Sequence, residues 1–149
     1  MSEETQRPEP VLMRAKTLWE GGLRCNTLIR GFEVHTDDPI KEWGTNTAAS
    51  PTETFLGAIG ACLTAVYAWT ALTSRVHHAA ITTTVTGKME EVDGKHKLTN
   101  IEINLKASAV EGTPEKLERI FELAHEKCLL INSIGIDTKL NFEYKIVDD

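Results

Sequence analysis

The chain has 149 residues, of which 41% are hydrophobic and 26% are charged, and its formal net charge is -6. This length and composition predict a single folded domain, residues 1–149, with one hydrophobic core. The negative charge and the lack of any basic run argue against a nucleic acid or an anionic membrane as a partner.

The first ten residues, MSEETQRPEP, are polar and acidic. They lack the basic start and the apolar segment of a secretory signal, so we expect a flexible tail over residues 1–10 and a cytoplasmic protein. The three cysteines are odd in number and widely spaced, unlike those of a disulfide-rich secreted module. No group of cysteines and histidines has zinc spacing, so we expect neither a metal nor another cofactor.

The first third of the chain is predicted to form three strands. Residues 11–19 and 22–30 read as a hairpin that turns at Gly21 and Gly22. Polar and apolar residues then alternate over residues 31–37, which indicates a third strand, and a loop rich in turn-forming residues follows.

A long helix is predicted from Pro51 to about residue 75. Ser50, Pro51 and Glu53 form the start signal of a capping box with proline at the first helical position. The stretch from Thr54 to Ser74 carries no charge and is barely long enough to span a membrane. Glycine and threonine residues interrupt it, so we expect a buried central helix instead.

The second half is predicted to contain a hairpin, a helix and a last strand. The hairpin covers residues 81–109 and turns at Asp93-Gly94, and the helix begins after Thr113 and runs to about Ile131. Residues 140–148 alternate as a strand. The order βββ-α-ββ-α-β, built from antiparallel hairpins, predicts an α+β fold and not a doubly wound parallel sheet.

Cys62 and Cys128 lie on apolar faces of the two predicted helices. A free cysteine in a core is often only a small hydrophobic residue. If the two helices pack together, however, the two thiols could reach disulfide distance, which requires Cα atoms within about 7 Å. The residues by themselves leave both interpretations open.

Two segments, SPTETFLGAIGACLTAV and GLRCNTLIRGFEVHTDDP, resemble the OsmC/Ohr superfamily, which comprises the osmotically inducible protein C and the organic hydroperoxide resistance proteins. The shared pattern is a proline-led helix with a cysteine eleven positions later, here Pro51 and Cys62, and a second cysteine late in the second helix, here Cys128. The resemblance implies an OsmC-like fold whose antiparallel sheets wrap around two long helices. It also implies an intertwined homodimer with active sites at the subunit interface.

The same resemblance implies a peroxiredoxin-like thiol peroxidase that reduces organic hydroperoxides. In that scheme Cys62 attacks the peroxide, Cys128 resolves the sulfenic acid as a disulfide, and an external dithiol resets the enzyme. Arg24 would be the cation that activates Cys62, with Arg14 and Arg30 as the other candidates. A sulfur or persulfide carrier and a non-catalytic dimer that binds a hydrophobic ligand are the alternatives on the same fold.

The sequence departs from the family pattern at two positions. The hydroperoxide-resistance branch has a glutamate directly after the proline, whereas this chain has Thr52 there and Glu53 one residue later. On a helix Glu53 would point away from Cys62, and a capping role accounts for it. Family members often have proline after the second cysteine, and this chain has Leu129.

Overall fold

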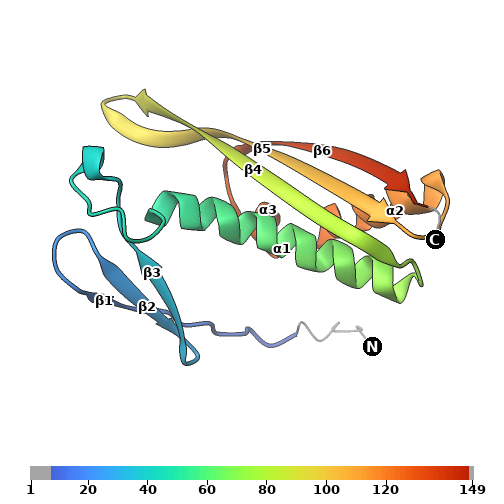
Figure 1. Ribbon diagram of the computed structural model, residues 1–149, viewed down its shortest axis with the longest axis horizontal. Coiled ribbons are helices and arrows are strands. Elements are labelled where there is room, and N and C mark those ends of the chain that lie inside the picture. The colour runs from blue at the N-terminus through green and yellow to red at the C-terminus, as the bar shows by residue number, and fades with distance from the viewer. Residues whose placement is uncertain (1–7, 148–149) are drawn as a thin grey trace, which may run out of the picture. The chain divides into compact units, whose positions relative to one another are not determined.

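The computed structural model describes residues 8–147, which form two compact units divided between Pro51 and Thr52 (Figure 1). That residues 1–149 form one domain stays a prediction. The predicted tail covers residues 1–10. Residues 1–7 lie outside the described residues, and residues 8–10 have no regular secondary structure.

The first unit contains a three-stranded antiparallel sheet in the order β1-β2-β3. Its strands are β1 (Lys16–Trp19), β2 (Cys25–Ile29) and β3 (Phe32–Thr36), and a short 3-10 helix, η1 (Ile40–Glu42), follows them. Gly21 and Gly22 form the predicted turn, and both have positive φ angles, which glycine adopts without strain.

The first strand begins later than the sequence predicts. Lys16 pairs with Leu28, and the β2–β3 turn begins only two residues after Leu28, at Arg30. Residues 11–15 therefore have no strand opposite them, and they form an extended lead into β1 instead of a strand.

The second unit contains a sheet and three helices. The elements in chain order are α1 (Pro51–Thr73), β4 (His78–Val92), β5 (Lys95–Ala109), α2 (Pro114–Lys127), α3 (Leu129–Ser133) and β6 (Asp137–Ile146). Both long helices begin at the prolines that the sequence indicates. Thr113 caps α2, because its hydroxyl accepts a hydrogen bond from the backbone N–H of Lys116.

The second sheet is mixed, which corrects the prediction of purely antiparallel sheets. β4 and β5 pair antiparallel around the Asp93-Gly94 turn as predicted, but β5 and β6 pair in parallel. A parallel pair needs a long crossover between its strands, and α2 with α3 supplies it. After β5 the chain runs back along α2 and α3, so β6 begins near the start of β5 and runs in the same direction.

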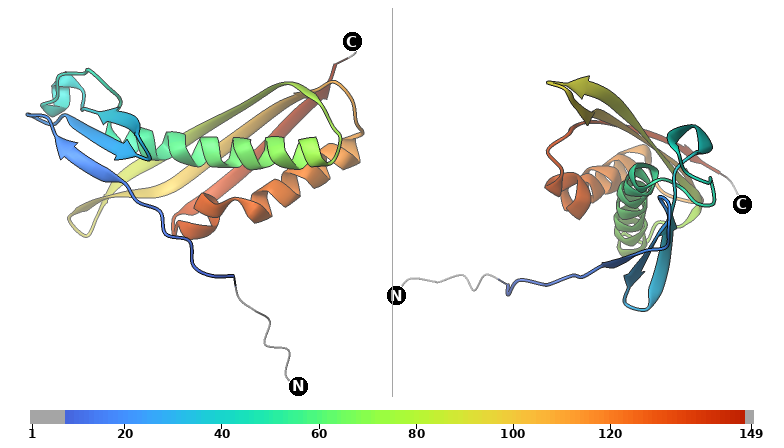
Figure 2. Two further views of the ribbon diagram at one scale, coloured as in Figure 1. Left: turned by 90° about the horizontal axis from the view of Figure 1, so that it is seen from below. Right: turned by 90° about the vertical axis from the view of Figure 1, so that its left-hand side faces the viewer.

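The two long helices of the second unit cover the same face of its sheet (Figure 2). The core between them is made of Ile59, Leu63 and Tyr67 from α1, Leu117 and Ile120 from α2, and Ile101, Ile103 and Leu105 from β5. The β5 residues alternate, as one buried face of a strand requires. Each such aliphatic side chain contributes about 1.5–3 kcal/mol through burial.

Helix α1 is long and apolar enough to cross a membrane by length and composition, with a mean hydropathy of 1.7. The core helix of a soluble protein meets the same criteria. In this structure Ile59, Leu63, Tyr67 and Ala71 of α1 belong to the buried core of the second unit. This arrangement fits the predicted central helix.

The second predicted helix is divided into two. Cys128 has φ -71° and ψ 106°, which is extended backbone, so α2 ends before Cys128 and α3 begins after it. The backbone N–H of Cys128 still bonds the carbonyl oxygen of His125 at 3.4 Å, and that of Asn132 bonds the carbonyl oxygen of Cys128 at 3.0 Å. Cys128 is therefore the joint between two helices.

Candidate active site

The structure brings Cys62 and Cys128 together. The two Sγ atoms are 3.5 Å apart, and the Cys128 thiol donates a hydrogen bond to the Cys62 sulfur. Both cysteines are free thiols. The condition that the sequence left open, contact between the two cysteine-bearing helices, is therefore met.

Their positions follow from the helix pattern. Cys128 continues the buried face of α2 that contains Ile120 and Ala124, at the spacing of about one turn. Cys62 lies between Ile59 and Val66 on α1, and it packs against the same core. Because α1 and α2 lie on one face of the sheet, the side of α1 that contains Cys62 meets the side of α2 that leads to Cys128.

The two thiols have different surroundings. Cys128 is fully buried, and Cys62 is half-buried. Burial raises the pKa of the Cys128 thiol, and the neighbouring Cys62 sulfur raises it further, while the backbone N–H groups of Ile131 and Leu130 oppose the shift. The Cys128 thiol is therefore protonated at neutral pH, and Cys62 is the sulfur with access to solvent.

Arg24 belongs to the first unit, whereas Cys62 and Cys128 belong to the second. It lies in the turn between β1 and β2, where its backbone N–H bonds Gly21 O and its carbonyl oxygen accepts from Glu20 N. Arg14 and Arg30 also belong to the first unit. The activating role of an arginine stays a prediction.

Glu53 lies in the second unit and lines an open hollow of about 380 Å³ between α1 and β4. Small residues of α1 form most of that lining, including Gly57 and Gly60. Cys62 is not part of the lining, which is consistent with the expectation that Glu53 and Cys62 lie on different sides of α1.

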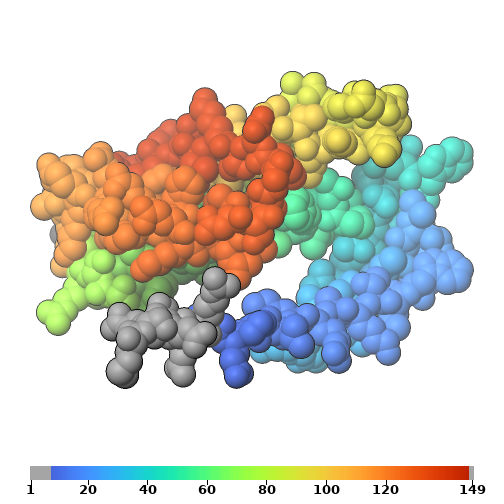
Figure 3. Space-filling view, turned by 180° about the vertical axis from the view of Figure 1, so that it is seen from behind, coloured from blue at the N-terminus to red at the C-terminus, as the bar shows by residue number. Residues whose placement is uncertain are grey.

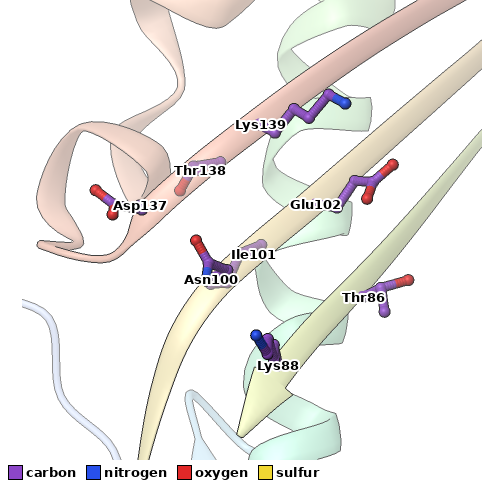
Figure 4. Close-up of a pocket in the computed structure, with 8 residues that line it drawn as sticks. All are labelled: Thr86, Lys88, Asn100, Ile101, Glu102, Asp137, Thr138 and Lys139. Atoms are coloured by element: carbon purple, nitrogen blue, oxygen red, sulfur yellow. The ribbon is translucent and has the colours of Figure 1, made fainter. Parts of the chain in front are cut away.

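A second hollow of the same unit, of about 570 Å³, lies on the outer face of the sheet (Figure 4). Its side chains come from β4, β5 and β6, and include Lys88, Glu102 and Lys139. The core side of the sheet, against α1 and α2, holds the thiol pair. This polar outer face is therefore not the thiol site.

Sequence reasoning missed one buried charged residue, Asp37. Its carboxylate accepts hydrogen bonds from the backbone N–H of Asp38 at 2.8 Å, and from the N–H and hydroxyl groups of Thr45 and Thr47. The hydrogen bond from the Thr45 hydroxyl has the largest effect on the pKa of Asp37. Together these bonds hold that pKa well below its ordinary value. The sequence signal was present, because an acidic residue before a loop rich in threonine is a common anchor.

No metal site emerges in the part of the chain from residue 8 to residue 147. There, no three His, Cys, Asp or Glu side chains are arranged to hold a metal ion.

Comparison with known structures supports the predicted fold. The OsmC-like protein of unknown function from Vibrio cholerae is 17% identical, with a TM-score of 0.78 over 89% of this chain and 99% of its own. The OsmC-like protein from Mycoplasma pneumoniae is 16% identical, with a TM-score of 0.76 over 93% of this chain and 99% of its own. Similarity at this level of identity concerns the fold.

An organic hydroperoxide resistance protein from Elizabethkingia anophelis is also similar. It is 19% identical, with a TM-score of 0.69 over 93% of this chain and 100% of its own. No curated protein sequence matches the chain. A family model described as OsmC-like protein matches residues 44–143, which is more than half of the sequence and includes both cysteines. The chain therefore belongs to the OsmC-like protein family, as the resemblance predicted.

Proposed function

We propose that the protein is a thiol peroxidase that reduces organic hydroperoxides, with Cys62 as the peroxidatic and Cys128 as the resolving cysteine. The observation that carries this proposal is the contact of the two thiols, 3.5 Å between sulfur atoms, inside an apolar core. Membership of the OsmC-like family supports a redox role. The similar structure described as an organic hydroperoxide resistance protein supports a peroxide as the substrate.

The asymmetry of the pair supports this assignment of roles. The attacking sulfur must be reachable by the peroxide, and Cys62 is the more exposed of the two. The resolving sulfur must be adjacent and needs no access to solvent, and Cys128 is buried with a raised pKa. A resolving thiol in contact with the sulfenic acid also protects it from over-oxidation.

The reaction has three steps. The Cys62 thiolate attacks the outer peroxide oxygen, the O–O bond breaks, and the alkoxide takes up a proton and leaves as an alcohol. The Cys128 sulfur then attacks the Cys62 sulfur, the S–O bond breaks, and the hydroxyl group leaves as water with the Cys128 proton. An external dithiol supplies the two electrons that reduce the resulting disulfide.

The proposal extends to the assembly and the location. Arg24 is the proposed cation that stabilises the Cys62 thiolate, because a thiolate is the nucleophile in such reactions. Trp69 and Leu72 of α1 are 63% and 61% exposed, and these apolar side chains support a homodimer that covers this side of the helix. A cytoplasmic location fits two thiols that work in the reduced state.

The test is the consumption of cumene hydroperoxide with dithiothreitol as the external dithiol. We expect Cys62→Ser to fall to the background rate, and Cys128→Ser to form a sulfenic acid on Cys62 that dimedone traps. Cys25→Ser is the matched control, because Cys25 lies in β2 of the first unit and should leave the rate unchanged. Full peroxidase activity of Cys62→Ser would refute the proposal. If the wild-type protein does not consume the hydroperoxide but Cys62 accepts labile sulfur, the protein is a sulfur carrier.

A further inference from the structure

One side chain bridges the break between α2 and α3. The amide nitrogen Nδ2 of Asn132, in α3, donates a hydrogen bond to the carbonyl oxygen of Glu126, in the last turn of α2, at 2.9 Å. The backbone N–H of Asn132 donates to the carbonyl oxygen of Cys128 at 3.0 Å. Figure 3 shows this part of the chain, in orange, on the near side. Asn132 therefore holds both sides of the joint, through contacts that lie within one chain.

The sequence around the joint favours an unbroken helix. Neither glycine nor proline stands between Lys127 and Ile131, and lysine and leucine are good helix formers. For this reason the sequence predicts one helix to about Ile131. The extended backbone of Cys128, with ψ 106°, therefore needs contacts that a continuous helix lacks.

The amide bond of Asn132 is a contact of this kind. In a continuous helix, positions six residues apart are separated by about 9 Å along the axis and lie on different sides of it. The Asn132 side chain would then not reach the Glu126 carbonyl oxygen. The backbone bond from Asn132 to Cys128, in contrast, has the ordinary helical spacing and fits both forms. An interaction made in only one of two states shifts the equilibrium toward that state, which here is the broken helix.

The break decides whether Cys128 keeps its place beside Cys62. The Cys128 sulfur, which is fully buried, lies 3.5 Å from the Cys62 sulfur, and Leu130 of α3 packs against the same core. On a continuous helix Leu130 would lie about 200° around the axis from Cys128. Only one of these two side chains would then face the core. The broken helix lets both of them do so, and it keeps the two thiols in contact.

We propose that Asn132 is a positioning residue for the thiol pair. Its amide keeps the helix broken at Cys128, and so holds the Cys128 sulfur where it attacks an oxidised Cys62. In peroxide reduction this role rests on the proposed function. There the Cys128 sulfur attacks the sulfenic sulfur of Cys62, the S–O bond breaks, and the hydroxyl group leaves as water with the Cys128 proton. Asn132 acts on this step through the backbone of Cys128.

Thiol exchange with dithiodipyridine measures this geometry without any hydroperoxide, in the full-length Cys25→Ser protein. The Cys62 thiolate attacks the reagent, its S–S bond breaks, one thiopyridone leaves, and Cys62 carries a mixed disulfide. The Cys128 sulfur then attacks the Cys62 sulfur, the Cys62–Cys128 bond forms, and a second thiopyridone leaves with the Cys128 proton. The rate of the second release reports the position of Cys128. Cys128→Ser should release only the first thiopyridone.

We expect Asn132→Ala to slow the second release about two- to tenfold, which corresponds to one net hydrogen bond, and to leave the first release unchanged. Ser133→Ala is the matched control, because the Ser133 hydroxyl also donates to a backbone carbonyl, that of Leu129, but within α3 alone. It should change neither release. Asn132→Asp removes the same donor from a side chain of similar shape, and it replaces Asn132→Ala if that variant does not fold. An unchanged second release in the Asn132 variant, or equal slowing in Ser133→Ala, would overturn the proposal.

A second substitution separates positioning from a general loss of stability. Proline at position 129 disfavours a helical backbone at Cys128, whatever the side chain of residue 132 does. We therefore expect Leu129→Pro, added to Asn132→Ala, to restore the rate of the second release. A double variant that stays as slow as Asn132→Ala would overturn the proposal.

Cumene hydroperoxide then distinguishes this proposal from the proposed function. We expect Asn132→Ala to lose the Cys62 thiol as fast as the wild type, and to accumulate more sulfinic acid on Cys62 in excess hydroperoxide. If the wild type does not consume the hydroperoxide but its second release depends on Asn132, the peroxidase proposal fails and the positioning role stands. A wild-type protein that releases only one thiopyridone would overturn both the pairing and the role of Asn132.

Discussion

The Cys128 Sγ atom lies 3.5 Å from the Cys62 Sγ atom, although 66 residues separate them in the chain. Cys62 belongs to a continuous helix of 23 residues, whereas Cys128 lies at a joint between two helices. The two sulfur atoms must come closer to form a disulfide. The joint can adjust its backbone with less loss of helical hydrogen bonding than the middle of α1 can, so we expect Cys128 to make most of that movement.

The different environments of the two thiols predict an order of alkylation. Because burial raises the pKa of Cys128 and excludes solvent from it, iodoacetamide at about neutral pH should modify Cys62 well before Cys128. Peptide mass spectrometry over time measures both. Unfolding in guanidinium should remove the difference, which is the control, and faster modification of Cys128 in the folded protein would contradict the assignment of roles.

The backbone at Cys128 predicts that proline is tolerated at position 129. Cys128 has the extended conformation that a residue before proline adopts, and Leu129 is the first residue of α3, where proline is favoured. The Leu129 side chain is exposed. We expect Leu129→Pro to keep the fold and to gain about 0.4–1 kcal/mol in the free energy of unfolding, measured with urea.

The control for this prediction is Asn132→Pro. The backbone N–H of Asn132 bonds the Cys128 carbonyl oxygen at 3.0 Å, so proline there removes a hydrogen bond at the joint and should destabilise the protein. Equal destabilisation by both prolines would mean that the backbone at Cys128 is not extended in solution. If the prediction holds, the departure from the family pattern at Leu129 leaves the local backbone unaltered.

His78 predicts a pH dependence of stability. Its Nε2 atom is 3.0 Å from the hydroxyl of the buried Tyr67, whose pKa burial raises to about 12. Burial lowers the pKa of His78 below its ordinary value of 6.5, His77 adds to this, and a backbone hydrogen bond with Val76 opposes it. Below about pH 6.5 the unfolded chain therefore binds this proton and the folded chain binds it less, so the free energy of unfolding falls as the pH falls.

Urea unfolding at about pH 7 and about pH 5.5 measures this fall in the free energy of unfolding. Both pH values lie above the range in which carboxylates titrate. We expect His78→Gln to flatten the pH dependence. His96→Gln is the control, because His96 is an exposed residue near the β4–β5 turn and should leave the slope unchanged. A slope that survives in His78→Gln would assign the effect to other groups.

Asp37 predicts a local effect on the loop that follows β3. Its carboxylate accepts hydrogen bonds from the backbone N–H groups of Asp38, Thr45 and Thr47, and the single oxygen of an amide cannot accept from all these donors. We expect Asp37→Asn to lower Tm and to speed proteolysis within residues 38–49, whereas the neighbouring variant Asp38→Asn should do neither.

Since its folded pKa is lowered, Asp37 stabilises the protein above about pH 4 and loses this effect below it, and Asp37→Asn should weaken the acid sensitivity.

Much of this fold could be predicted from the sequence, because its signals are local. The α1 and α2 starts depend on Pro51 and Thr113, and the β4–β5 turn depends on Asp93-Gly94, all of which act through their own backbone geometry. The position of Cys62 on α1, and of Cys128 in line with the buried face of α2, followed from spacing. Their identification as a pair came from the family resemblance.

The features that the sequence did not predict depend on distant parts of the chain. The parallel direction of β6 is set by the crossover through α2 and α3, and the strands themselves carry no sign of it. The helix break at Cys128 has neither glycine nor proline to announce it. The role of Asp37 depends on threonines eight and ten residues away that fold back onto it.

The central claim is that Cys62 and Cys128 form a redox pair, and its most direct test is stoichiometric oxidation. One equivalent of cumene hydroperoxide is added to the reduced protein, free thiols are followed over time, and tryptic peptides are identified by mass spectrometry. We predict the rapid loss of two thiols with a Cys62–Cys128 linkage, faster than with hydrogen peroxide. No thiol loss over minutes, or a linkage that involves Cys25 instead, would contradict the account.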